Sequence, residues 1–217
     1  WRDAAVSYIW WFDHSSHMGT EALERPPPTE EPAPEWDDEY LDDAADQLAH
    51  NYDLAANVTI RDEPFDLYGR MKMKSQKHFL HPSISFAQHE AHEHLFVRRV
   101  DALYVAELEH LVEFCHDLAD DWIEPDEEHY GTEFTVVLVP PVLTDDIRSF
   151  VEGFRDRTLI KFGYHGHYEV NLVVAAPSDD DLVASENADV RSAFATWEPI
   201  EREEPGLLDL IARRLQL

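Results

Sequence analysis

The chain has little cysteine, little glycine and little positive charge. Its 217 residues include one cysteine, Cys115, and seven glycines. A single cysteine excludes a disulfide framework and a cysteine-based zinc site, and it is typical of proteins in a reducing compartment. The few glycines form no dinucleotide-binding, Walker or nucleophile-elbow pattern. The sequence therefore contains no recognisable catalytic motif.

Long hydrophobic runs are missing as well. A helix that crosses a bilayer needs about 18 or more consecutive apolar residues, and the chain has no such run. The early stretch AVSYIWWF is shorter than that and has no basic flank, so it does not resemble a signal peptide. We therefore expect a cytoplasmic protein that does not enter a membrane.

Positive charge is scarce, and lysine is rarest. The 17 Lys and Arg residues face 46 Asp and Glu residues, which gives a formal net charge of −29, and only four residues are lysine. Such a surface repels itself in dilute buffer, whereas at about 1 M salt the Debye length falls to about 3 Å. The composition predicts a halophilic protein that needs high salt for stability. It also argues against binding of nucleic acid, whose phosphates favour basic proteins.

The first 36 residues differ in composition from the rest. Residues 1–24 contain three of the six tryptophans, and residues 24–36 contain five prolines. Proline-rich segments are stiff and extended, and exposed tryptophans favour contact with another surface. We predict a Trp-rich arm and Pro-rich linker over residues 1–36, followed by a single α+β domain over 37–217 with a C-terminal helix. We expect the arm to pack either on the domain or on a second copy of the chain, and the second alternative predicts a homodimer.

Hydrophobic spacing predicts the elements of this domain. Helices are expected over residues 37–51, 104–122, from Thr144 onward, over 186–197 with Ser185 as cap, and after Pro205. Strands are expected around 65–74, 83–88, 94–100, 132–139 and 158–176, the last as one long strand or a strand pair. HEAHE (89–93) is interpreted as a hairpin turn. This order predicts an α+β fold with a mixed sheet of about five strands and helices packed on it.

Histidine gathers in two short stretches. In GYHGHYEVNLVVAAP (163–177), alternate positions hold His165, His167 and Glu169, which would share one face of a strand. Two imidazoles and a carboxylate suit zinc or non-haem iron, and HEAHEH (89–94) adds His92 and His94. A divalent metal with these ligands would favour a metal-dependent hydrolase or small-ligand enzyme. The alternatives are the solvent-exposed side of a strand end and a polar ligand or interface role.

Basic residues gather in one region of this acidic chain. Residues 61–99 hold seven basic and five acidic side chains, including three of the four lysines. Arg70, Lys72 and Lys74 would line one face of a strand. They predict a site for a small anionic ligand, a phosphate or a carboxylate. The alternative is a set of cross-strand ion pairs.

Several segments carry a resemblance to a known group of proteins. They are HNYDL, FDLYGRMKMKSQKHFL, EHLFVRR, DEEHYGTEFTVVLV, FRDRTLIKFGYHGHYEVNLVVAAP and SENADV. Over roughly residues 45–197 the chain resembles a haloarchaeal protein family of unknown function, distantly similar to bacterial proteins with a domain of unknown function. The resemblance implies no activity, cofactor or catalytic residue. Our first interpretation is a binding or interaction protein, with the metal-dependent enzyme and the anion-binding module as alternatives.

Overall fold

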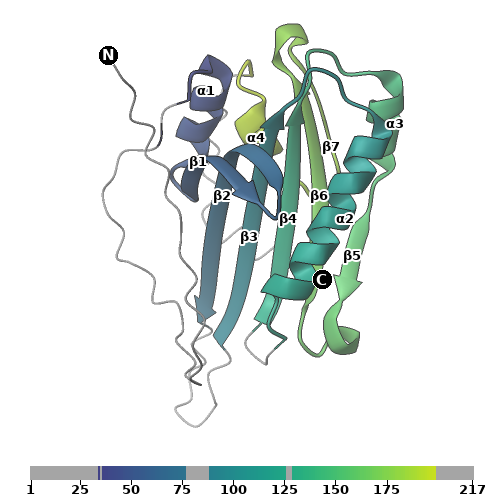
Figure 1. The fold of residues 1–217 in the computed structure, drawn as a ribbon. Helices are drawn as coiled ribbons and strands as arrows, with labels where there is room; N and C mark the ends of the chain where they lie inside the picture. Colours follow the sequence, from purple (N-terminus) through teal and green to yellow (C-terminus); the bar gives the residue numbers. More distant parts are fainter. Residues whose placement is uncertain (1–33, 35, 77–87, 126–128, 199–217) are drawn as a thin grey trace. The chain divides into compact units, whose positions relative to one another are not determined.

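A computed structural model describes residues 34, 36–76, 88–125 and 129–198; for 73–76 and 88–90 it describes the backbone alone. Within these residues the chain forms a seven-stranded sheet and four α-helices (Figure 1). None of the described helices is long and apolar enough to cross a membrane. With η for a 3-10 helix, the elements are α1 (Glu39–Leu48), β1 (Asp53–Ile60), β2 (Glu63–Gln76), β3 (Gln88–Arg99), α2 (Val105–Trp122), β4 (His129–Val139), α3 (Asp145–Gly153), β5 (Asp156–Leu159), η1 (Ile160–Gly163), β6 (His167–Ala176), η2 (Pro177–Asp179), β7 (Asp181–Ala184) and α4 (Arg191–Phe194).

The sheet is mixed, as the sequence predicted, but it has seven strands rather than five. Its order is β1-β2-β3-β4-β6-β5, and β7 also pairs with β6. β1, β2 and β3 form an antiparallel meander, whereas β3, β4 and β6 run parallel. β5 and β7 both pair antiparallel with β6, the first along its start and the second along its end. The three parallel strands are therefore central and covered on both faces.

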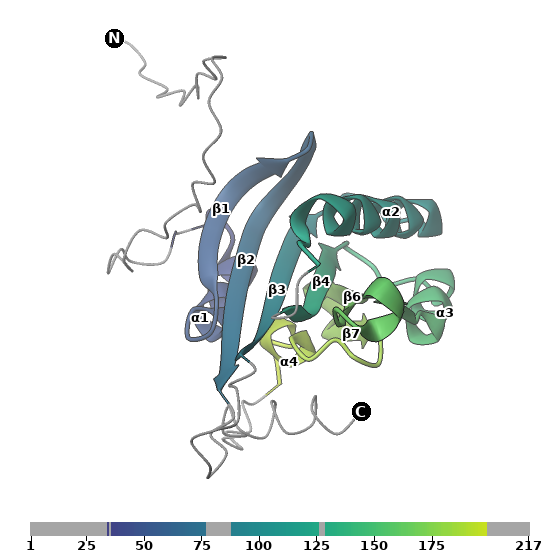
Figure 2. The same cartoon turned by 90° about the horizontal axis from the view of Figure 1, so that it is seen from below.

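Successive side chains of the central strands point to opposite faces of the sheet, so the core has two layers. One layer contains Leu95, Val137 and Val173 and packs against α1 and α4. The other contains Phe96, Phe134 and Leu172 and packs against α2 and α3. Figure 2 shows α2 and α3 on one side of the sheet and α1 and α4 on the other. Parallel strands buried on both faces are expected to be apolar throughout, so any polar residue facing inward from them is conspicuous.

Local signals account for the helices that the sequence predicted. Asp38 caps α1 by accepting hydrogen bonds from the backbone N–H groups of Tyr40 and Leu41. The Thr144 hydroxyl accepts from the Ile147 N–H at the start of α3. α2 buries an apolar stripe that includes Cys115, and burial raises the pKa of its thiol. Cys115 is therefore a packing residue, as its place on the stripe indicated.

Two strands, β1 and β7, were not predicted, and two local predictions were wrong. The HEAHE segment is not a turn, because β3 runs from Gln88 without a break between β2 and β4, which bond to both of its edges. Ser185 caps no helix: its hydroxyl accepts from the Leu172 N–H and donates to Asn171, and α4 begins only at Arg191. The arm and linker, the strand start at 83–87 and the C-terminal helix lie outside the described residues, apart from Pro34 and Trp36.

Candidate functional site

Three glutamates lie in one row across the central parallel strands. Glu93 on β3 pairs in register with Glu133 on β4, which pairs with Glu169 on β6. Neighbouring strands are about 4.8 Å apart, so the three side chains leave the sheet side by side on the face that α1 and α4 cover. Glu93 is 2% exposed and Glu169 is 7% exposed. A row of carboxylates at this depth is unusual, because buried charges need compensating partners.

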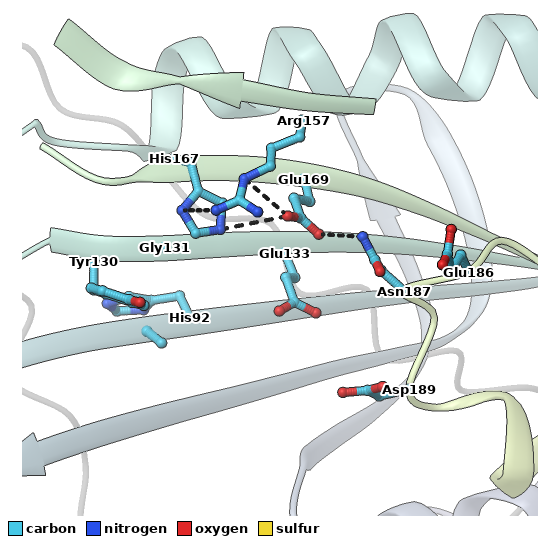
Figure 3. A pocket seen from close by; sticks show the side chains of 11 residues that line it. His92, Tyr130, Gly131, Glu133, Arg157, His167, Glu169, Glu186, Asn187 and Asp189 are labelled. Atoms are coloured by element: carbon cyan, nitrogen blue, oxygen red, sulfur yellow. Dashed lines mark hydrogen bonds and ion pairs between the residues drawn. The ribbon is translucent and has the colours of Figure 1, made fainter. Parts of the chain in front are cut away.

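A pocket of about 320 Å³ opens over this row. Residues from the starts of β4 and β6, from β3 and β5, and from the loop between β7 and α4 line it (Figure 3). They are Ala91, His92, Tyr130, Gly131, Glu133, Arg157, His167, Glu169, Glu186, Asn187 and Asp189. The His167 ring lies over Gly131, where a side chain would contact it. Most of the residues that line the pocket thus carry polar or charged side chains.

Glu169 is held by three neighbours. Its Oε1 lies 3.3 Å from Arg157 Nε and 3.7 Å from His167 Nε2, and its Oε2 accepts a hydrogen bond from Asn187 Nδ2 at 3.3 Å. Figure 3 shows the Arg157 and His167 side chains converging on one side of this carboxylate and Asn187 on the other. These contacts offset the cost of burying the carboxylate and orient it at the pocket wall.

The pocket carries an excess of negative charge. Among the described residues, its lining contains four carboxylates, those of Glu133, Glu169, Glu186 and Asp189, and one guanidinium, that of Arg157. Arg157 pairs with Glu169, and Arg155 from outside the lining pairs with Glu186 at 2.8 Å. Carboxylates gathered in a concave wall focus the electrostatic potential, which attracts positively charged ligands.

The amide nitrogen of a buried asparagine next to the row lacks a hydrogen-bond partner among the described residues. Asn171 follows Glu169 on the same face of β6 and is 3% exposed. Its Oδ1 accepts a hydrogen bond from the Ser185 hydroxyl, whereas Nδ2 has no hydrogen-bond partner in the part of the chain that the structure describes. Asn171 lines a smaller adjoining hollow that shares Arg157, Glu186 and Asn187 with the pocket. A buried N–H group without a partner favours a polar ligand atom in the adjoining hollow that could accept a hydrogen bond from it.

Only some of the five residues predicted to bind metal lie close together in the structure. His167 and Glu169 adjoin, and His92 lines the same pocket. His165 precedes β6, and its backbone carbonyl accepts a hydrogen bond from His129 Nδ1. His94 lies on the opposite face of the sheet, against Phe134 and Trp122. Across the described ranges, no three His, Cys, Asp or Glu residues form a group that could hold a metal ion.

The predicted anion-binding residues lie on β2, and Arg70 and Lys72 are on the face that α2 covers. Arg70 pairs in register with His94, and Lys72 pairs with His92. The Arg70 guanidinium is 3.9 Å from the Asp53 carboxylate on β1. The side chain of Lys74 lies outside what the structure describes. Arg70 and Lys72 therefore share one surface with His94, not with the acidic pocket.

Sequence reasoning missed Glu93, Glu133 and Arg157 as site residues. A signal for the row was present, because each central strand begins its apolar stretch directly after or near a glutamate: EHLFV, EFTVV and EVNLVV. That signal acquires meaning only when the three strands are known to be neighbours in matching register. Arg157 had no comparable signal, since β5 is a four-residue edge strand.

His94 should make the stability of the domain fall on acidification. Burial lowers the pKa of His94 from 6.5 to about 4, and the positive charges of His92 and Arg70 add to the effect. Between these two pH values the unfolded chain binds a proton that the folded chain does not. The contribution of His94 to the free energy of unfolding is therefore fully present above pH 6.5 and is lost as the pH falls toward 4. We expect the free energy of unfolding to fall by roughly 2–3 kcal/mol because of this residue, since a difference of one pKa unit corresponds to about 1.4 kcal/mol.

Urea unfolding at several pH values in high salt measures this loss. His94→Phe should flatten the decline between pH 6.5 and 4, whereas His50→Gln, at an exposed position after α1, should not. Parallel pH profiles for His94→Phe and the wild type would contradict the assignment.

Comparison with known proteins identifies a family but no activity. Residues 37–196 match the family described as Domain of unknown function (DUF8052), and the chain belongs to that family. No curated protein and no solved structure matches the chain. The predicted membership of a family of unknown function is confirmed, while the haloarchaeal and bacterial relationships stay predictions.

Proposed function

We propose that this domain is a non-catalytic binding domain whose pocket over the glutamate row takes a small organic cation, such as an amine or a guanidinium compound. The observation that carries the proposal is the register of Glu93, Glu133 and Glu169 on three adjacent strands beneath a pocket with four carboxylates and one guanidinium. The size of the pocket suits a small molecule.

An organic cation fits this arrangement better than a bare ion. Both oxygens of Glu169 are already engaged by Arg157, His167 and Asn187. A metal ion needs several oxygen ligands at about 2.0–2.6 Å, so it would have to displace those contacts. An ammonium or guanidinium group instead adds N–H donors to carboxylates spaced about 4.8 Å apart across the strands.

Titration with 1,4-diaminobutane tests the proposal. In about 1 M KCl, where exposed charges are screened but enclosed ones less so, the diamine should raise the unfolding temperature and release or absorb heat in calorimetry. Glu133→Gln should weaken binding at least about tenfold, equivalent to about 1.4 kcal/mol. The uncharged analogue 1,4-butanediol should have no effect.

Glu109→Gln, at an exposed position on α2, is the matched control for the loss of one carboxylate. It should bind the diamine like the wild type. Equal binding by the Glu133 and Glu109 variants would rule out this pocket as the cation site.

A metal-dependent hydrolase is the second candidate, because His92, His167 and Glu169 border one pocket, but these three would have to move closer together to hold a metal ion. The same titration repeated with MgCl₂, MnCl₂ and ZnCl₂, together with elemental analysis of untagged protein, distinguishes the two. Stoichiometric metal that His167→Ala and Glu169→Gln remove would support the enzyme and contradict the cation-binding proposal.

The proposal also places the protein in a salt-rich cytoplasm and includes a homodimer through residues 1–36. The charge of −29 and the scarcity of lysine support the salt requirement. The three tryptophans of the arm support the dimer. The proposed cation site depends on neither of them.

A further inference from the structure

A second pocket lies on the opposite face of the sheet and shares His92 with the pocket of the proposed cation site. Its volume is about 230 Å³, and it is bordered by three histidines, His92, His94 and His129, together with Trp122 and Thr132. Trp122 is the last residue of α2, and the other four belong to β3 and β4. His92 borders both pockets, next to the point where the pairing of β3 and β4 shifts register.

His94 presents a polar atom to this pocket. The residue is 9% exposed, and its Nδ1 shares a 2.8 Å hydrogen bond with the Tyr68 hydroxyl. Burial raises the pKa of Tyr68 to about 12, so the phenol keeps its proton and can donate it to Nδ1. A neutral imidazole that accepts at Nδ1 carries its own proton on Nε2. No hydrogen bond from a described residue reaches Nε2, which leaves this N–H for an occupant.

The side chains of His129, Thr132 and Trp122 form other walls of the pocket. His129 Nδ1 donates to the His165 carbonyl at 2.7 Å, so its Nε2 accepts from the Thr132 hydroxyl at 2.9 Å. The Trp122 ring lies 4.9 Å from the His94 ring and is 39% exposed. A partly exposed indole at the wall of a pocket favours a flat apolar group that covers it.

Cationic side chains of β2 stand beside this pocket. Among the described residues, one acidic side chain, that of Glu124, lines it. On β2, Arg70 and Lys72 stand beside His94 and His92 in register. The guanidinium of Arg70 is near enough to lower the pKa of His94 by charge repulsion. A ligand with one negative charge would be attracted here despite the strongly acidic chain.

From these features we infer that the second pocket binds a small aromatic carboxylate. The aromatic ring packs against Trp122, while the carboxylate accepts from His94 Nε2 and faces Arg70 and Lys72. This ligand accounts for Arg70 and Lys72, two of the three basic residues that the sequence predicted to bind an anion. It does not depend on what the acidic pocket binds.

Calorimetric titration of the full chain with sodium benzoate in about 1 M KCl tests the inference. We expect one benzoate per chain, and a dissociation constant raised at least about tenfold by Arg70→Gln and by Trp122→Ala. Both residues are at the surface, so the variants should fold. His94→Phe, which keeps a ring but removes the N–H donor, should also weaken binding.

Arg155→Gln is the matched control, because the side chains of Arg70 and Arg155 are each 50% exposed and each faces one carboxylate. This variant and Glu133→Gln should bind benzoate like the wild type. Cyclohexanecarboxylate, inorganic phosphate and benzylamine should all bind more weakly than benzoate.

Three results would overturn the inference. The first is no heat and no stabilisation by benzoate. The second is benzoate binding that neither Arg70→Gln nor Trp122→Ala changes. The third is equal or tighter binding of phosphate, cyclohexanecarboxylate or benzylamine, because the ring and the negative charge would then not both be recognised.

Discussion

Gly166→Ala should destabilise the domain by more than about 3 kcal/mol, a large part of the 5–15 kcal/mol typical of a domain. Gly166 has a φ of +74° just before β6, where a side chain costs about 1–3 kcal/mol in strain. A methyl group there would also overlap the backbone carbonyl of Tyr130, which cannot move without disturbing β4. The close approach of these two backbones places His167 over Gly131 at the pocket.

Gly163→Ala is the control that separates strain from overlap. Gly163 also has a positive φ, +87°, but a methyl group there would meet no atom within 4 Å. We expect the free energy of unfolding to fall by only about 1 kcal/mol in this variant. Urea unfolding of both variants in high salt, followed by circular dichroism, measures the difference. Similar midpoints for the two variants would show that the backbone contact with Tyr130 is not made.

Removing the partner of a buried carboxylate should also lower the stability of the domain substantially. Arg157→Leu leaves Glu169, 7% exposed, without its guanidinium. Breaking a fully buried ion pair costs about 3–5 kcal/mol. Because the Arg157 side chain is 42% exposed and Asn187 and His167 still contact Glu169, we expect roughly 1–3 kcal/mol.

A double variant tests whether the loss comes from the uncompensated charge. Arg157→Leu combined with Glu169→Gln should be more stable than Arg157→Leu alone, because the amide needs no counter-ion. Arg155→Leu, which breaks the more exposed pair with Glu186, should change stability by no more than about 1 kcal/mol. A double variant that is no more stable than Arg157→Leu would argue against a charge-compensating role for Arg157.

Both predictions concern features that sequence patterns could not reveal. The periodic apolar stripes of α1 and α2 and the threonine cap of α3 are local signals, and the structure confirms them. HEAHE was misinterpreted because its polar composition is typical of a turn. The segment is a strand because β2 and β4 satisfy its backbone on both edges, and those neighbours are distant in sequence.

In the candidate site, too, the sequence predicted some neighbours correctly and others depended on the tertiary structure. From the sequence, His167 and Glu169 were predicted to lie together, and they do. The prediction that His165 joins them failed because a tight turn with left-handed residues, Lys161 and Phe162, precedes β6 and places His165 outside the strand. His94 was grouped with the same cluster, whereas its place in β3 directs it to the other face.

By itself the sequence determined the charge of the chain, the absence of a disulfide framework, the α+β class and the main helices. These properties depend on composition or on residues within a few positions of one another. Tertiary structure alone decided that Glu93, Glu133 and Glu169 form one row and that the histidines divide between two pockets. The physical reason is strand register: alternation defines two faces locally, but only long-range hydrogen bonding and two buried core layers decide which residues become neighbours.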